Sequence, residues 1–145
     1  MKRFKFGLEK VLKLRQHNEH EARVELGRAI GVLAGIENEI KRNAATRAGA
    51  IHERFAGITA GDGAASFSMH AWDAYINRLE LEAERLMEAA AKAEIVVEEK
   101  RNLYVEASRE LKVMENLKEK REKEHRKEMF TVETKEMDDR KINNR

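Results

Sequence analysis

The sequence contains no proline and no cysteine, and only 6% of its 145 residues are aromatic. A chain of this length with ordinary proline usage would have roughly seven prolines. Proline breaks a helix because its ring clashes with the preceding turn and it lacks an N–H donor. The absence of cysteine excludes disulfides and thiol chemistry and fits a reducing compartment. Together these absences favour long uninterrupted helices over a compact domain with a cleft.

Long apolar runs are also missing. No stretch approaches the roughly 18 apolar residues of a transmembrane helix, and the first residues lack the apolar core of a signal peptide. Charged residues make up 39% of the chain, but 29 Lys and Arg stand against 27 Asp and Glu. A near-balanced charge does not favour nucleic acid or an acidic membrane as the main partner. We therefore expect a cytoplasmic protein with no nucleic-acid partner and no direct membrane insertion.

An apolar heptad repeat runs through the second half of the chain. Spacings of four and three alternate without a break from Trp72 to Met114, and only Lys100 among these positions is polar. A helix with such a narrow seam can bury it only against another helix. The positions are Trp72, Ile76, Leu79, Ala83, Leu86, Ala90, Ala93, Val97, Lys100, Tyr104, Ala107, Leu111 and Met114.

The first half carries a less regular stripe. Its spacing slips after Ala22, across Ile40 and at Ile51, and such insertions locally unwind a left-handed supercoil. The predicted stripe is Phe4, Leu8, Val11, Arg15, Asn18, Ala22, Leu26, Ala29, Leu33, Ile36, Ile40, Ala44, Arg47, Ile51 and Phe55.

Three glycines and an aspartate within residues 57–66 predict a turn between the two patterns. The predicted fold class is therefore all-α, a long antiparallel two-helix coiled-coil hairpin forming a single domain over residues 1–145. Its expected parts are a helix over 4–55, a turn over 57–66, a helix over 67–130 and a frayed tail over 131–145. Folding the chain about residue 62 places Leu8 near residue 117. It also places Arg15 and Asn18 opposite Ser108 and Glu110, where the seam is polar.

Residues that suggest chemistry are few. His17 and His20 lie near Glu21 on one helical surface, but zinc sites normally draw ligands from more than one element. The Gly61-Asp62-Gly63 sequence lacks the Gly-Lys-Ser/Thr of a phosphate loop. No nucleophile has a base at a suitable spacing. We therefore predict that the chain is not an enzyme and has no catalytic residue, cofactor or metal.

Three surface features point instead to partners. Gly27, Gly31 and Gly35 repeat every four residues on the face opposite the seam. They predict a docking groove, a local bend, or helix positions where glycine is merely tolerated. Tyr75 is a candidate anchor, because aromatic side chains on a charged rod often carry binding energy. The third feature is a basic end: residues 1–15 contain six Lys or Arg and one Glu. It fits an acidic partner or a solvated helix face.

Two motifs resemble the family of the flagellar export protein FliJ. The first is Phe4-x-Phe6-x-Leu8-Glu9-x-Val11-Leu12-x-Leu14-Arg15, followed by Glu19, Ala22 and Leu26. The second, after the predicted turn, is Trp72-x-x-Tyr75-Ile76-x-x-Leu79-Glu80. The resemblance covers nearly the whole chain, although the glycine stripe is not part of the family pattern.

The resemblance implies a component of the flagellar type III export apparatus that is similar to the central stalk of a rotary ATPase. It implies three partners: the flagellar export ATPase, the export gate membrane protein and substrate chaperones. Leu8, Val11 and Arg15 would face the ATPase ring, and Tyr75 and Leu79 would meet the gate. Such a protein would be cytoplasmic and peripherally associated with the cytoplasmic face of the inner membrane.

Three alternatives remain open at this point. The first is the injectisome counterpart of the same stalk, which shares its form. The second is a generic coiled-coil adaptor or spacer without an ATPase partner. The third is a basic helix associated with RNA or a membrane, for which steep salt dependence of nucleic-acid binding would be diagnostic.

Overall fold

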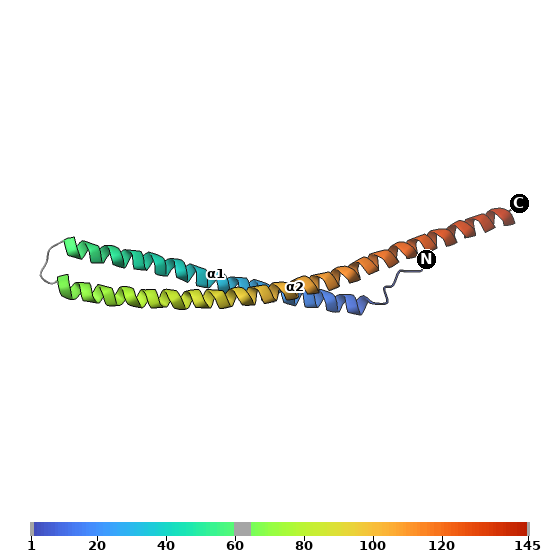
Figure 1. Cartoon of the computed structure of the whole chain (residues 1–145). Coiled ribbons are helices and arrows are strands. Elements are labelled where there is room, and N and C mark those ends of the chain that lie inside the picture. The colour runs from blue at the N-terminus through green and yellow to red at the C-terminus, as the bar shows by residue number, and fades with distance from the viewer. Residues whose placement is uncertain (1, 60–64, 145) are drawn as a thin grey trace. The chain divides into compact units, whose positions relative to one another are not determined.

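A computed structural model of the chain describes residues 2–59 and 65–144, leaving out the centre of the predicted turn. The described residues form two helices, α1 (Glu9–Thr59) and α2 (Ala65–Asn143), and no strand. Figure 1 draws α1 from blue to green and α2 from green to red. The two helices pack against each other, which confirms the all-α helical hairpin.

The helices contribute to two compact units. Unit 1 comprises residues 1–23 and 102–145, and unit 2 comprises residues 24–101. Both termini therefore belong to unit 1. In unit 2 the green end of α1 and the start of α2 run side by side (Figure 1).

The start of α1 differs from the prediction. The helix begins at Glu9 rather than Phe4, and Gly7 and Leu8 form a turn before it. Glycine is a poor helix former, and the basic residues that precede it would oppose the positive end of the helix dipole. Glu9 has the favourable sign for a first turn. Its N–H donates to the carbonyl of Phe6 at 3.2 Å, which closes the turn.

The other helix ends also lie beyond the predicted ones. α1 continues to Thr59 rather than ending near residue 55, and α2 begins at Ala65 rather than residue 67. α2 runs to Asn143, so the prediction of a frayed tail over 131–145 was wrong up to that residue. Residues 118–141 are rich in Lys, Glu, Arg and Met, which form helices well without tertiary contacts. Arg140 and Lys141 in the last turn suit the negative end of the helix dipole.

The seam of α2 follows the predicted register. Every one of its positions from Trp72 to Met114 is buried or half-buried, and Val97 is only 7% exposed. Lys100 is half-buried with the rest. The heptad spacing therefore predicted the seam positions correctly, including the one occupied by a charged residue.

The seam of α1 is more regular than predicted, and the expected slips were wrong. Leu12, Asn43, Ala50 and Arg54 occupy the seam, while Val11, Ala44, Ile51 and Phe55 are exposed. At Ala44, Ile51 and Phe55 the prediction had favoured the more apolar of two neighbours, but a packed helix keeps its geometric period. The resulting spacing of four and three is unbroken along Leu12, Arg15, Glu19, Ala22, Leu26, Ala29, Leu33, Ile36, Ile40, Asn43, Arg47, Ala50 and Arg54.

The core of unit 2 is small. Ala50, Ile76 and Leu79 form its buried cluster, and Trp72 and Tyr75 pack against it. The side-chain amide of Asn43 donates to the backbone carbonyl of Leu79 at 3.0 Å. Small seam residues keep the two helices close but supply little buried apolar area, so polar contacts between the helices carry part of the specificity.

Candidate functional site

The most distinctive feature of unit 1 is an N-terminal arm, residues 2–8, that precedes α1. Residues 2–6 have no helical structure, and Phe4 and Phe6 face one side while Lys5 between them is exposed. Phe6 is 8% exposed, and the guanidinium of Arg121 lies 5.8 Å from its ring centre. The rings of Phe4 and His125 are 5.5 Å apart. The arm therefore lies on α2.

Two polar contacts hold the ends of this region. The Nζ of Lys118 lies 3.1 Å from Oε2 of Glu9, at the first residue of α1. The Nε2 of His125 lies 3.2 Å from the carbonyl oxygen of Lys2, so His125 is the donor. A shallow cavity between arm and helix is lined by Phe4, Lys5, Phe6, Glu9, Lys118 and Glu122.

Five basic side chains lie in the arm and at the start of α1. All are exposed, and among the described residues none of them forms an ion pair. They are Lys2, Arg3, Lys5, Lys10 and Lys13. The basic end predicted from the sequence is thus an exposed cationic surface, defined here by these five residues and called the basic end.

The residues assigned to the ATPase ring lie next to this surface with different exposures. Leu8 is half-buried, whereas Val11 is 36% exposed and free of the seam. Arg15 forms an ion pair with Glu110. Val11 is therefore more accessible to a partner than Leu8, the other apolar side chain of this set.

A polar layer in the seam of unit 1 was only partly predicted. The contact of Arg15 with Glu110 matches the expected pairing. Glu19, which the prediction had missed, is 6% exposed and accepts a hydrogen bond from Arg23 at 2.6 Å. That hydrogen bond raises the pKa of Arg23, which keeps its positive charge. Strict heptad spacing from Leu12 would have placed Glu19 in the seam.

The two residues assigned to the export gate have different environments in unit 2. Tyr75 is half-buried, in an edge-to-face contact with Trp72 at 6.1 Å and beneath the guanidinium of Arg78 at 5.5 Å. Leu79 is 7% exposed and belongs to the buried cluster. A partner can reach Tyr75 at the surface, while Leu79 serves the packing of the two helices.

The glycine stripe is exposed, as predicted. A Cβ atom added to Gly27, Gly31 or Gly35 would meet no heavy atom within 4 Å beyond its chain neighbours and the nearby backbone of its own helix. The stripe is therefore open helix surface with room for larger side chains. No described contact identifies an occupant.

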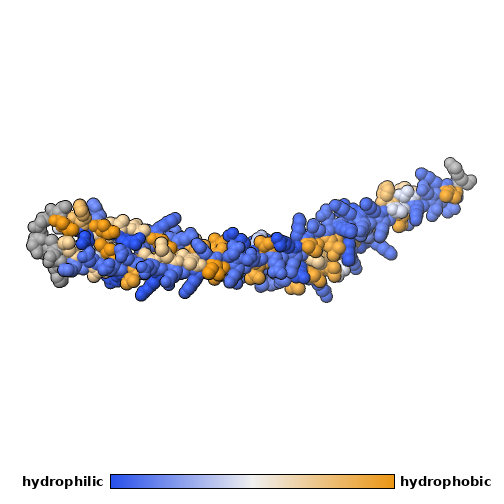
Figure 2. All heavy atoms as spheres, in the orientation of Figure 1, coloured by the Kyte–Doolittle hydropathy of each residue, from blue (hydrophilic) through white to orange (hydrophobic). Residues whose placement is uncertain are grey.

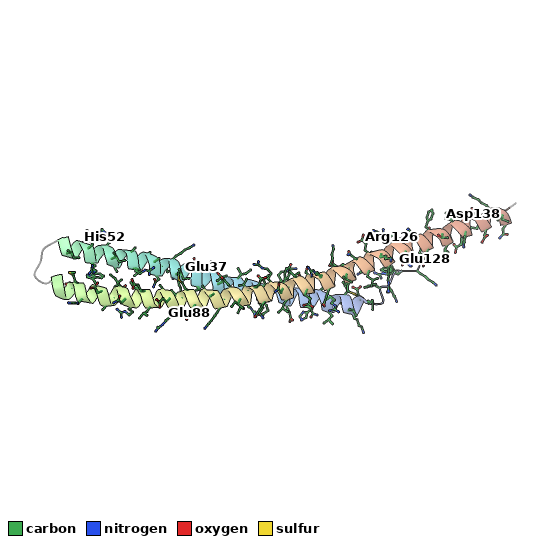
Figure 3. The ribbon with its side chains drawn as sticks, viewed as in Figure 1. Glu37, His52, Glu88, Arg126, Glu128 and Asp138 are labelled. Carbon is green, nitrogen blue, oxygen red and sulfur yellow. The ribbon has the colours of Figure 1, made fainter. Side chains whose placement is uncertain are left out.

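The surface of the molecule is predominantly polar, as Figure 2 shows for the visible face. Figure 3 labels charged residues such as Glu37, Arg126 and Asp138, whose side chains are exposed on α1 and α2. Exposed apolar residues also occur near the end of α2, namely Phe130, Val132, Met137 and Ile142. The sequence prediction singled out none of these residues: Phe130 was the last residue of the predicted second helix, and the other three fell in the predicted frayed tail.

The described part of the chain contains no group of His, Cys, Asp or Glu side chains suited to a metal. His17 instead pairs with Glu21 at 3.0 Å along the helix, and His20 is exposed without joining them. Neither described helix has a stretch apolar enough to cross a membrane.

The chain matches a known protein family. The family model for the flagellar FliJ protein matches residues 4–144. No curated protein and no solved structure gives a significant match. The match spans both helices and the motifs around the arm and Tyr75. The chain therefore belongs to the flagellar FliJ family, whose members are associated with flagellar protein export.

Proposed function

We propose that this chain is a non-enzymatic, stalk-like component of the flagellar type III export apparatus that binds the export ATPase ring through unit 1. The supporting observation is the exposed basic end beside Val11, within a chain that matches the flagellar family over residues 4–144. Uncompensated positive charge at an exposed helix start suits an acidic protein surface. The flagellar match favours this system over the injectisome counterpart.

A second contact of the same proposal is the export gate membrane protein, which would meet unit 2 at Tyr75. The aromatic ring is partly accessible and is fixed by Trp72 and Arg78, so it would lose little freedom on binding. Leu79 would support this contact from within the core. Binding to the gate would keep the protein at the cytoplasmic face of the inner membrane. Exchange with substrate chaperones completes the proposal.

The test is ATP hydrolysis by the cognate flagellar export ATPase, measured with and without this protein, alongside ring assembly by light scattering. We expect stimulation and ring formation at substoichiometric protein. No effect on either quantity would leave a coiled-coil adaptor without an ATPase partner.

Two single substitutions separate the proposed contacts. Val11→Ala should reduce ATPase stimulation, while Val96→Ala, a matched control in unit 2 with 42% exposure, should not. Tyr75→Ala should weaken gate binding and leave stimulation intact, with the exposed Leu81→Ala as its control. Equal loss of both activities in the Tyr75 variant would argue against separate contacts, provided that its circular dichroism melt is unchanged.

A further inference from the structure

The surface of α2 beneath the N-terminal arm has the form of a peptide-binding face. Lys118, Arg121, Glu122 and His125 share one side of the helix, because each is three or four residues from two of the others; these four residues are called the arm-binding face. The segment that lies on this face is not part of a helix, and one residue separates its two phenylalanines. An extended segment presents such residues to the same side.

The contacts show what this face recognises. Phe6 is almost fully buried next to Arg121, and Phe4 lies against the ring of His125. A guanidinium beside an aromatic ring is a favourable geometry, and so is a pair of ring side chains in contact, here tilted at 44° to each other. The polar contact of the arm with His125 uses a backbone carbonyl, that of Lys2, which every peptide possesses. Recognition therefore depends on the aromatic pair more than on the other side chains.

The arm ends in the turn at Gly7 and Leu8, which leads into α1, and among the described residues it belongs to neither helix. We propose that the arm-binding face is a docking surface for an extended Phe-x-Phe segment of a partner protein. In the free chain the arm occupies the face in cis, and the partner segment displaces it. This inference does not rest on the identity of the ATPase or the gate.

The experiment uses the full-length chain with Phe4→Ala and Phe6→Ala, which vacates the face and keeps both helices. The probe is a synthetic peptide with the arm sequence Met-Lys-Arg-Phe-Lys-Phe-Gly, and the readout is the amide shifts of residues 118–125 by nuclear magnetic resonance. A tethered competitor acts at a millimolar effective concentration. We therefore expect saturable shifts in the variant and binding at least about tenfold weaker in the wild type.

Two controls address specificity. A peptide with alanine in place of both phenylalanines should produce no saturable shift at these amides. Arg121→Ala with His125→Ala, added to the vacated chain, should abolish binding of the original peptide. Absence of saturable shifts at millimolar peptide would overturn the proposal, as would equal affinity for the wild-type and vacated chains.

A second measurement keeps both phenylalanines in place. The chain has no cysteine, so Lys2→Cys accepts a single spin label. The label should broaden the amides of residues 118–125, and excess peptide should relieve that broadening as the arm leaves. Broadening that persists at saturating peptide would show that the arm is not displaceable.

Discussion

Asn43 introduces an amide into the seam of unit 2, where the neighbouring positions are mostly apolar. Its Nδ2 bonds to the carbonyl of Leu79, 36 residues away, while its buried Oδ1 has no hydrogen-bond partner among the described residues. A buried acceptor without a donor is costly, but a polar residue in a seam also fixes the alignment of two helices. Asn43 therefore lowers the stability of the packed helices but fixes their alignment.

Asn43→Leu should raise the free energy of unfolding by about 1–2 kcal/mol, because the unpaired Oδ1 disappears and an apolar side chain fills the seam. Urea denaturation followed by circular dichroism measures this change. The exposed Asn102→Leu is the control and should alter stability by less than about 0.5 kcal/mol. A lower stability of the Asn43 variant would mean that the bond to Leu79 outweighs the unpaired oxygen.

At the scale of the helix, the regular 3.5-residue period decides which residues pack. Leu86 and Val97 lie in the α2 seam, whereas Leu81 and Ile95, of similar chemistry, are 56% and 60% exposed. Hydrophobicity does not distinguish these two pairs, but their place in the repeat does. The two pairs therefore provide a matched test of the register.

Leu86→Asp combined with Val97→Asp should lower the free energy of unfolding by more than about 3 kcal/mol, because each carboxylate would enter the seam without a partner. Leu81→Asp with Ile95→Asp should leave the circular dichroism melt nearly unchanged. If the two double variants melted alike, the heptad register would be wrong.

The glycine stripe is a second property of the element. The methyl group of alanine at Gly27, Gly31 or Gly35 would meet nothing within 4 Å beyond its chain neighbours and its own helix backbone, so only helix propensity should change. Each substitution should stabilise α1 by up to about 1 kcal/mol, seen as a higher melting temperature. If the stripe is a docking groove, the stabilised triple variant should lose affinity for export partners. Full affinity in that variant would identify the glycines as tolerated helix positions.

At the scale of the whole molecule, charge is distributed unevenly between the units. Unit 1 contains 19 Lys and Arg against 14 Asp and Glu, while unit 2 contains 10 against 13. A nearly neutral chain thus contains one basic and one acidic unit. Such separation favours an oriented encounter with an acidic partner more than a high affinity.

Stimulation of the export ATPase should accordingly weaken as salt rises from low to about 0.3 M, because exposed charges are screened beyond about a Debye length. Lys10→Glu with Lys13→Glu should reduce both the stimulation and its salt dependence. Lys92→Glu with Arg101→Glu, exposed in unit 2, is the control and should reduce neither. Salt-independent stimulation by the wild-type chain would contradict an electrostatic contact at the basic end.

The sequence by itself determined the two helices and the seam of α2. These features follow from local rules, because a helix repeats every 3.6 residues and the absence of proline lets it continue. Folding the chain about residue 62 also placed Arg15 opposite the region of Glu110, with which it pairs. The exposed glycine stripe followed from the same periodicity.

Only the tertiary structure decided which of two adjacent candidates enters the seam of α1, as with Leu12 over Val11 and Ala50 over Ile51. It also decided that Phe4 and Phe6 lie in an arm on α2 rather than in a first helical turn. Both outcomes depend on the opposing helix. Its fixed spacing selects the facing residue, and its surface buries Phe6 to 8% exposure.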